Sequence, residues 1–120
     1  MKLALLGYGR MGKAIEVIAI ARGHQVVAKI DKDNPDESIE AADVAINFSI
    51  PEAAVSNISN ALNQGIPVVC GTTGWLKSRD AIELLCEEKK GAFLYASNFS
   101  LGVNLFFELN QRLAALMENY

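Results

Sequence analysis

The chain opens with the sequence KLALLGYGRMG at residues 2–12, an apolar run that leads directly into three closely spaced glycines. The apolar run predicts a buried strand, and the glycines predict a tight turn into a helix. Gly7 would permit the turn, Gly9 would let a bound group approach the backbone, and Gly12 would let the helix pack closely on the strand. A helix N-terminus offers free N–H groups and the positive end of its dipole, so this stretch predicts a phosphate-binding turn.

The next segments extend this turn into a nucleotide-binding unit. Residues 11–22 show helical periodicity, and residues 25–30 read as a second apolar strand. Asp31 follows that strand, about 20 residues after the last glycine of the turn, where a carboxylate can accept hydrogen bonds from a ribose. A simpler role, in which Asp31 only ends the strand, is the alternative. Because the neighbouring Lys32 can pair with a 2′-phosphate, we predict NAD(P)H binding, with NADH favoured and NADPH tolerated.

Strands and helices alternate through the rest of the chain. Further strands are predicted at residues 44–48, 68–70 and 92–96, and further helices over residues 50–64 and 78–90. Ser49 and Glu52 predict a capping box at the first of these helices, whereas the crossover over residues 32–43 has room for one helical turn or none. Continuous apolar strands are typical of sheets covered on both faces. The predicted fold class is therefore α/β, a Rossmann-like doubly wound parallel sheet with helices on both faces, with residues 1–120 as one dinucleotide-binding domain.

Composition limits the other classes of protein. The 120 residues are 51% hydrophobic and 21% charged, as in one globular domain, and the net charge of −3 offers no basic surface for nucleic acid. No apolar run reaches the roughly 18 residues of a membrane span, and no signal peptide is apparent. Cys70 and Cys86 lack metal-type spacing, so we expect two buried free thiols, no metal site and a cytoplasmic location.

A second ligand loop is predicted at Gly71-Thr72-Thr73-Gly74. The loop follows the strand at residues 68–70, and ligands of doubly wound sheets bind at the carboxyl ends of the strands. Its backbone N–H groups and two threonine hydroxyls would face such a ligand. A plain turn is the alternative interpretation.

Four motifs occur in an order that resembles the nucleotide-binding part of one enzyme family. They are GYGRMG at residues 7–12, NFS at 47–49, GTTG at 71–74 and ASNFS at 96–100, followed by GVN at 102–104. Together they resemble the 4-hydroxy-tetrahydrodipicolinate reductase (dihydrodipicolinate reductase) family over essentially the whole chain. The family more often has Asp where Asn47 stands and Pro where Ser97 stands.

This resemblance implies hydride transfer from NADH or NADPH to a cyclic imine-type substrate in bacterial lysine and diaminopimelate biosynthesis. The cofactor-binding residues that it implies, together with the glycine turn, are Gly7, Tyr8, Gly9, Arg10, Met11, Gly12, Asp31, Lys32, Phe48, Gly71, Thr72, Thr73, Ala96, Ser97, Asn98 and Phe99. The last two loops would lie beside the nicotinamide. Contact with phosphate and a solvated position at the helix start are both open for Arg10.

The resemblance also implies what this sequence does not contain. The family's substrate domain, with a histidine-rich motif and a proton-donating lysine, would follow this point, yet His24 is the only histidine and lies on a different loop. We therefore predict no catalytic residue here and expect a truncated or domain-only reductase that binds cofactor without turnover. The alternatives are the cofactor domain of another NAD(P)-dependent dehydrogenase and a non-catalytic nucleotide-sensing module.

Apolar residues crowd the last predicted helix, which begins at Leu101. Leu105, Leu109, Leu113 and Leu116 form one stripe by their spacing of three and four. Burial of this helix on the sheet is one interpretation. The width of the apolar face instead favours a surface for a further domain, and if left exposed it predicts self-association.

Overall fold

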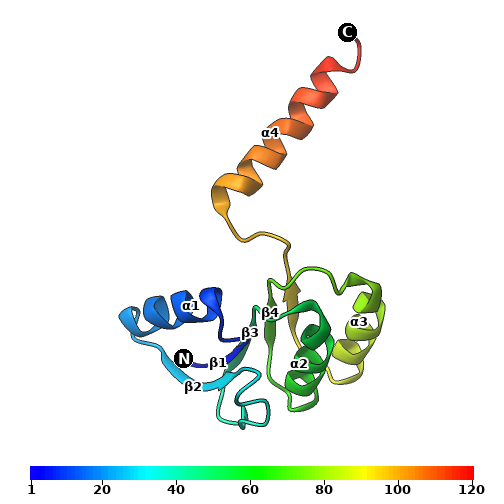
Figure 1. Cartoon of the computed structure of the whole chain (residues 1–120). Coiled ribbons are helices and arrows are strands. Elements are labelled where there is room, and N and C mark those ends of the chain that lie inside the picture. The colour runs from blue at the N-terminus through cyan, green and yellow to red at the C-terminus, as the bar shows by residue number, and fades with distance from the viewer.

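The computed structural model describes residues 1–120 and shows one five-stranded sheet in which every neighbouring pair of strands is parallel (Figure 1). The strands are β1 (Lys2–Leu6), β2 (Gln25–Ile30), β3 (Val44–Asn47), β4 (Val68–Cys70) and β5 (Phe93–Tyr95). Their order across the sheet is β2-β1-β3-β4-β5. The chain therefore begins in the interior of the sheet, adds β2 on one side and continues on the other. The predicted α/β class is confirmed.

Helices lie on both faces of this sheet. The helices that cover the sheet are α1 (Arg10–Ala21), α2 (Pro51–Asn63) and α3 (Arg79–Glu88), with a short 3-10 helix η1 (Leu76–Ser78) before α3. The last helix, α4 (Leu101–Met117), follows β5 and does not cover the sheet. In Figure 1, α1 lies on one side of the sheet, and α2 and α3 lie beside each other on the opposite side. The helix of each β-α-β connection therefore packs on the face of the sheet that a right-handed crossover gives it.

The main core lies under α2 and α3. Its sheet layer consists mainly of small and branched side chains, namely Ala4, Leu6, Ala28, Ile30, Ala45, Val68 and Cys70. Ile58 and Leu62 of α2 and Ile82 of α3 pack against this layer and are almost completely buried. Alternate apolar residues of the strands therefore point to this face, which α2 and α3 cover well.

The opposite face is covered only in part. The register aligns Leu5 of β1 with Lys29 of β2 and with Ile46 of β3, then Ile46 with Val69 and Val69 with Leu94. Leu5 is 1% exposed, whereas Leu94 on the edge strand is 55% exposed. Helix α1 thus covers the β1–β2 side of this face and leaves its β5 side open to solvent.

The crossover from β2 to β3 contains no helix. Residues 31–43 form turns and irregular backbone, as the length of this segment predicted. Ile39 is 1% exposed and joins the core on the face that α2 and α3 cover. One apolar side chain of the loop therefore occupies part of the space that a crossover helix would fill.

The predicted capping box at Ser49 is wrong. Helix α2 begins at Pro51 with Ile50 as its N-cap, and no side chain caps it. A residue before proline is pushed out of helical geometry, and Ile50 accordingly is extended, with ψ of 155°. Ser49 lies further back in the loop, where its N–H donates to Thr72 Oγ1 at 2.8 Å.

Two burial predictions need correction as well. The predicted helix over residues 78–90 has Leu84 and Leu85 among its expected inward positions. Leu85 is partly buried against the core, but Leu84 is 57% exposed, and Ile82 is the buried residue of that helix. Cys70 is buried and unpaired as expected, whereas Cys86 is unpaired but only partly buried. Helix α3 begins at Arg79 after a 3-10 turn, and Ile82 and Leu85 are its isoleucine and leucine side chains that pack on the core.

Helix α4 projects away from the sheet (Figure 1). None of its residues is buried, so the interpretation that it packs on its own sheet is wrong. The chain is correspondingly elongated, with a radius of gyration of 16.5 Å, against roughly 14 Å for a compact chain of this length. Neither α4 nor any other helix combines the length and apolarity needed to cross a membrane.

Candidate functional site

The loops that follow the five strands lie at one edge of the sheet, because parallel strands all end on the same side. These loops begin at Gly7, Asp31, Phe48, Gly71 and Ala96. All sixteen residues predicted to bind cofactor lie in them or in the first turn of α1. The fold therefore brings the predicted residues to the edge where doubly wound sheets bind ligands.

The glycine turn has the close approaches that its sequence predicted. Gly7 has φ of +101°, and a Cβ there would lie 2.3 Å from the Phe48 carbonyl oxygen. A Cβ on Gly12 would lie 2.4 Å from the Gly7 carbonyl oxygen, so α1 packs directly against the turn. A Cβ on Gly9 would meet nothing within 4 Å. The space beside Gly9 is thus open for a bound group, as a phosphate cradle requires.

The N-terminus of α1 is free to bind an anion. Gly9 is its N-cap, no side chain caps it, and no acidic residue lies in its first turn. Arg10 and Met11 are exposed, and Arg10 forms no ion pair. The first N–H groups of the helix therefore lack protein side-chain partners, and its dipole favours negative charge at this end.

Tyr8 is tied to α1 and β2 by its hydroxyl. The hydroxyl donates to Glu16, and the Lys29 Nζ lies 2.6 Å from Glu16 Oε1 and 4.8 Å from the Tyr8 ring centroid. The Glu16 hydrogen bond raises the pKa of Tyr8, and the Lys29 ammonium lowers the pKa of Glu16. The same ion pair raises the pKa of Lys29. All three groups thus keep the protonation states that hold them together.

The end of β2 places a carboxylate and an ammonium side by side. The half-buried Asp31 accepts the Lys32 N–H at 2.8 Å through Oδ1, and its Oδ2 has no hydrogen-bond partner. The exposed Lys32 side chain forms no ion pair. One carboxylate oxygen and one ammonium are therefore available at the position where the sequence predicted ribose recognition.

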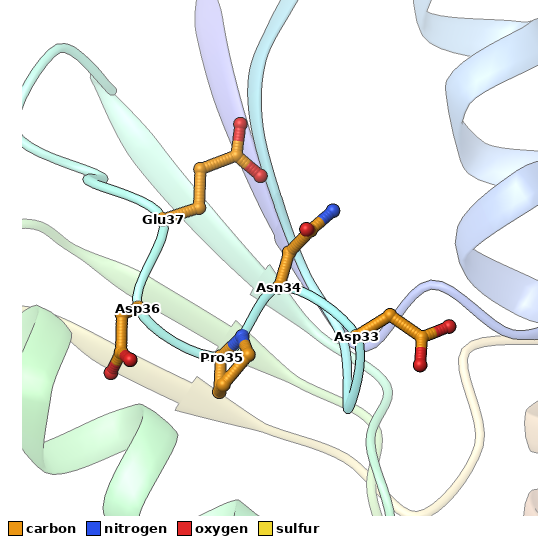
Figure 2. Close-up of a pocket in the computed structure, with 5 residues that line it drawn as sticks. All are labelled: Asp33, Asn34, Pro35, Asp36 and Glu37. Atoms are coloured by element: carbon orange, nitrogen blue, oxygen red, sulfur yellow. The ribbon is translucent and has the colours of Figure 1, made fainter.

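The loop beyond Lys32 is acidic. Asp33, Asn34, Pro35, Asp36 and Glu37 line an open depression of about 410 Å³, three of them with a carboxylate side chain (Figure 2). Their carboxylates point in different directions in Figure 2, and no group of His, Cys, Asp or Glu in the structure could hold a metal ion. The loop is thus a source of negative potential near Asp31.

An aromatic contact connects three of the loops. Phe48 follows β3 and its ring packs directly on Gly71, where a Cβ would lie 2.1 Å from the ring. Phe99 approaches the same ring edge-on, with 6.2 Å between centroids. The absence of a side chain at Gly71 therefore lets the Phe48 ring lie against the loop after β4, and Phe99 links the β5 loop to that ring.

Thr72 has a different role from the one its sequence suggested. We expected both threonine hydroxyls to face a ligand, but Thr72 is 5% exposed. Its Oγ1 accepts the Ser49 N–H at 2.8 Å and lies 3.3 Å from the Asn47 amide nitrogen. Only Thr73 offers an exposed hydroxyl, because the neighbouring loop uses that of Thr72.

The loop after β5 is shaped by its own side chains. Ala96 donates its N–H to the Cys70 carbonyl at 3.2 Å, which continues the β4–β5 pairing by one residue. Asn98 Oδ1 accepts the Ser100 N–H at 2.7 Å, and the Asn104 amide donates to the Asn98 carbonyl at 3.0 Å. Ser97 is exposed. These hydrogen bonds fix the loop conformation that precedes the first turn of α4.

Two sets of polar contacts near this edge were not predicted from the sequence. In the first, Asn47 is completely buried and its Oδ1 accepts from the Asn57 amide at 3.4 Å, which joins the end of β3 to α2. The other is the cluster of Tyr8, Glu16 and Lys29. A lysine inside the otherwise apolar run of residues 26–30 was the available signal, since such a residue needs a partner.

Comparison with known proteins agrees with this geometry. A family model described as "Dihydrodipicolinate reductase, N-terminus" matches residues 1–99. A 4-hydroxy-tetrahydrodipicolinate reductase from Christiangramia forsetii is 53% identical over 98% of this chain and 50% of the relative. One from Alkaliphilus metalliredigens is 36% identical over 99% of this chain and 50% of the relative. The chain spans about half the length of the curated relatives it matches.

Two solved structures share the fold. A protein from Archaeoglobus fulgidus, provisionally described as a homoserine dehydrogenase, superposes with a TM-score of 0.65 at 20% identity, over 79% of this chain and 42% of that one. A protein from Klebsiella pneumoniae, provisionally described as an oxidoreductase, superposes with a TM-score of 0.58 at 26% identity, over 79% of this chain and 34% of that one. At 20% identity, the similarity to the Archaeoglobus fulgidus protein shows a shared fold only.

Proposed function

The chain belongs to the dihydrodipicolinate reductase N-terminus family, and on this basis we propose that it binds NAD(P)H at the carboxyl edge of its sheet. The glycine turn of residues 7–12 would hold the pyrophosphate, and Asp31 with Lys32 would face the adenosine ribose. The loops at residues 71–73 and 96–99, with Phe48 between them, would lie beside the nicotinamide. Bound there, the cofactor supplies a hydride.

One observation carries this proposal, namely the geometry of the glycine turn. Gly7 and Gly12 are packed so closely that a Cβ on either would clash with backbone, while the space beside Gly9 is open. This combination leaves the N-terminus of α1 uncapped and accessible. A turn that served only to connect a strand to a helix would not need all three features.

We propose further that residues 1–120 act as the cofactor domain of a 4-hydroxy-tetrahydrodipicolinate reductase, and that the substrate is held by a second domain. The acceptor would be the cyclic imine-type substrate of bacterial lysine and diaminopimelate biosynthesis. Hydride transfer needs acceptor and donor about 3–3.5 Å apart, with a proton source beside the acceptor. We assign no such proton source to these residues, and we place the protein in the cytoplasm.

A binding and turnover experiment tests the proposal. Titration of the 120-residue chain with NADH, followed by cofactor fluorescence, is expected to give saturable binding. A reductase assay with the cyclic substrate is expected to show no turnover above the uncatalysed rate. Absence of binding for both NADH and NADPH would overturn the cofactor site, and measurable turnover would overturn the assignment of catalysis to a second domain.

The ribose end predicts which cofactor binds more tightly. A 2′-phosphate would meet the acidic loop of residues 33–37, and Lys32 is the only cation among residues 31–37. We therefore expect tighter binding of NADH than of NADPH. Lys32→Ala should weaken NADPH about tenfold, as for loss of one charge-assisted hydrogen bond, and leave NADH within about twofold. Equal NADPH affinity in wild type and variant would contradict the role of Lys32.

A further inference from the structure

A polar cluster links the glycine turn to two other elements. It consists of Tyr8 in the turn, Glu16 on α1 and Lys29 on β2. The Tyr8 hydroxyl donates to Glu16, whose Oε1 lies 2.6 Å from Lys29 Nζ. The same ammonium lies 4.8 Å from the Tyr8 ring centroid, within the range of a cation–π contact. The three side chains thus close a ring of contacts.

The cluster braces the turn where a ligand would press on it. A Cβ on Gly12 would lie 3.4 Å from Tyr8 Cδ2, so the Tyr8 ring lies against the closest approach of turn and helix. The hydroxyl end of that ring is fixed by Glu16, and Lys29 lies against the ring as well. Glu16 and Lys29 side chains are 18% and 37% exposed, so water competes only partly for these contacts.

The cluster also balances charge. Glu16 is the only acidic residue of α1, the helix whose N-terminus faces the proposed pyrophosphate. An unpaired carboxylate on this helix would oppose the binding of a dianion. Lys29 is the only cation within salt-bridge distance of Glu16. The pair therefore removes one unfavourable charge from the neighbourhood of the turn.

We propose that Tyr8, Glu16 and Lys29 form a positioning cluster, which holds the glycine turn in its anion-binding shape and cancels the Glu16 charge beside the bound pyrophosphate. This inference rests on the cofactor proposal above for its effect on binding. The three residues act through the turn and need not touch the cofactor themselves. A double variant that removes both the Glu16 and the Lys29 charge separates the electrostatic role of this pair from its structural role.

NADH titrations of four variants test this cluster. Lys29→Met leaves Glu16 unpaired and should raise the Kd for NADH about tenfold, while Tyr8→Phe keeps the ring but loses its anchor and should raise it about threefold. The double variant Glu16→Gln/Lys29→Met removes both charges and should bind within about threefold of wild type. Glu83→Gln is the matched control, because it breaks the exposed Arg79–Glu83 pair, also 2.6 Å long, on α3.

The NADH affinity of the double variant decides whether the Glu16–Lys29 pair acts by cancelling charge. A double variant as weak as Lys29→Met, or a Lys29→Met variant with wild-type Kd, would overturn the charge balance. Amide hydrogen exchange tests positioning without any ligand. The Lys13 N–H, which donates to the Gly9 carbonyl at 3.1 Å, should exchange faster in Tyr8→Phe and not in Glu83→Gln. Unchanged exchange would overturn the positioning, whereas failure of wild type to bind either cofactor would overturn the cofactor proposal alone.

Discussion

Replacing Gly12 by alanine is expected to destabilise the fold severely. The added Cβ would lie 2.4 Å from the Gly7 carbonyl oxygen. The position of a Cβ is fixed by the backbone and the carbonyl belongs to the backbone, so neither atom can rotate away. Helix α1 would have to move off the turn, at a cost of about 3 kcal/mol or more. Thermal unfolding followed by circular dichroism should show a Tm lower by roughly 10–15 °C.

Gly9→Ala is the matched control for this variant. It introduces the same methyl group three residues earlier, where nothing lies within 4 Å and the φ of −82° is outside the left-handed region that favours glycine. The Tm should therefore stay within about 2 °C of wild type. The methyl would nevertheless occupy the space in which a pyrophosphate approaches the backbone, so the affinity for NADH should fall by about tenfold or more. Wild-type NADH affinity in Gly9→Ala would contradict the proposed site.

Helix α4 is expected to make the chain self-associate. Leu105, Leu109 and Leu113 are 54–64% exposed along one stripe. Burial of each leucine would contribute about 1.5–3 kcal/mol, and a solitary helix of 17 residues is only marginally stable in water. Sedimentation velocity at high protein concentration should show species larger than the monomer. Leu109→Glu/Leu113→Glu should shift the population to monomer, because charges would then have to be buried at the contact.

Arg112→Gln is the control on the same helix. It breaks the exposed pair with Glu108, 2.9 Å long, without changing the leucine stripe. The oligomer distribution should stay as in wild type. A wild-type chain that sediments strictly as a monomer at all concentrations would show that the apolar face of α4 does not mediate contact between copies.

The α/β class and most element positions could be predicted because local patterns and the fold agree. The range of β2 and that of β4 match the predicted strands residue for residue, since both are short apolar runs between turn residues. The conformations of Gly7 and Gly12 follow from their spacing, because each role needs a residue without a side chain. The missing crossover helix followed from the length of the segment alone.

The errors arise where tertiary contacts decide. Ser49 has a capping sequence, yet Pro51 keeps Ile50 extended and the Thr72 hydroxyl binds the Ser49 N–H, so this backbone stays in the loop. Thr72 looked like a free hydroxyl because nothing in its own loop shows that the β3 loop lies against it. Glu16 and Lys29 lie on different elements, and only the packing of α1 on β2 makes them neighbours. Contacts between loops of different strands leave no local pattern in the sequence.

The solvent-exposed apolar side chains of α4 and of Leu94 also affect how the protein responds to temperature. The heat-capacity change of unfolding arises chiefly from apolar groups that are hydrated only in the unfolded chain. Leu94 and the leucine stripe of α4 are already exposed to water in the folded monomer, so they add little to the heat-capacity change of unfolding. Per residue, this heat capacity should lie below the usual value of about 12–15 cal/mol/K. The stability curve of the monomer is then flatter than that of a fully covered domain of equal length, with less loss of stability on cooling.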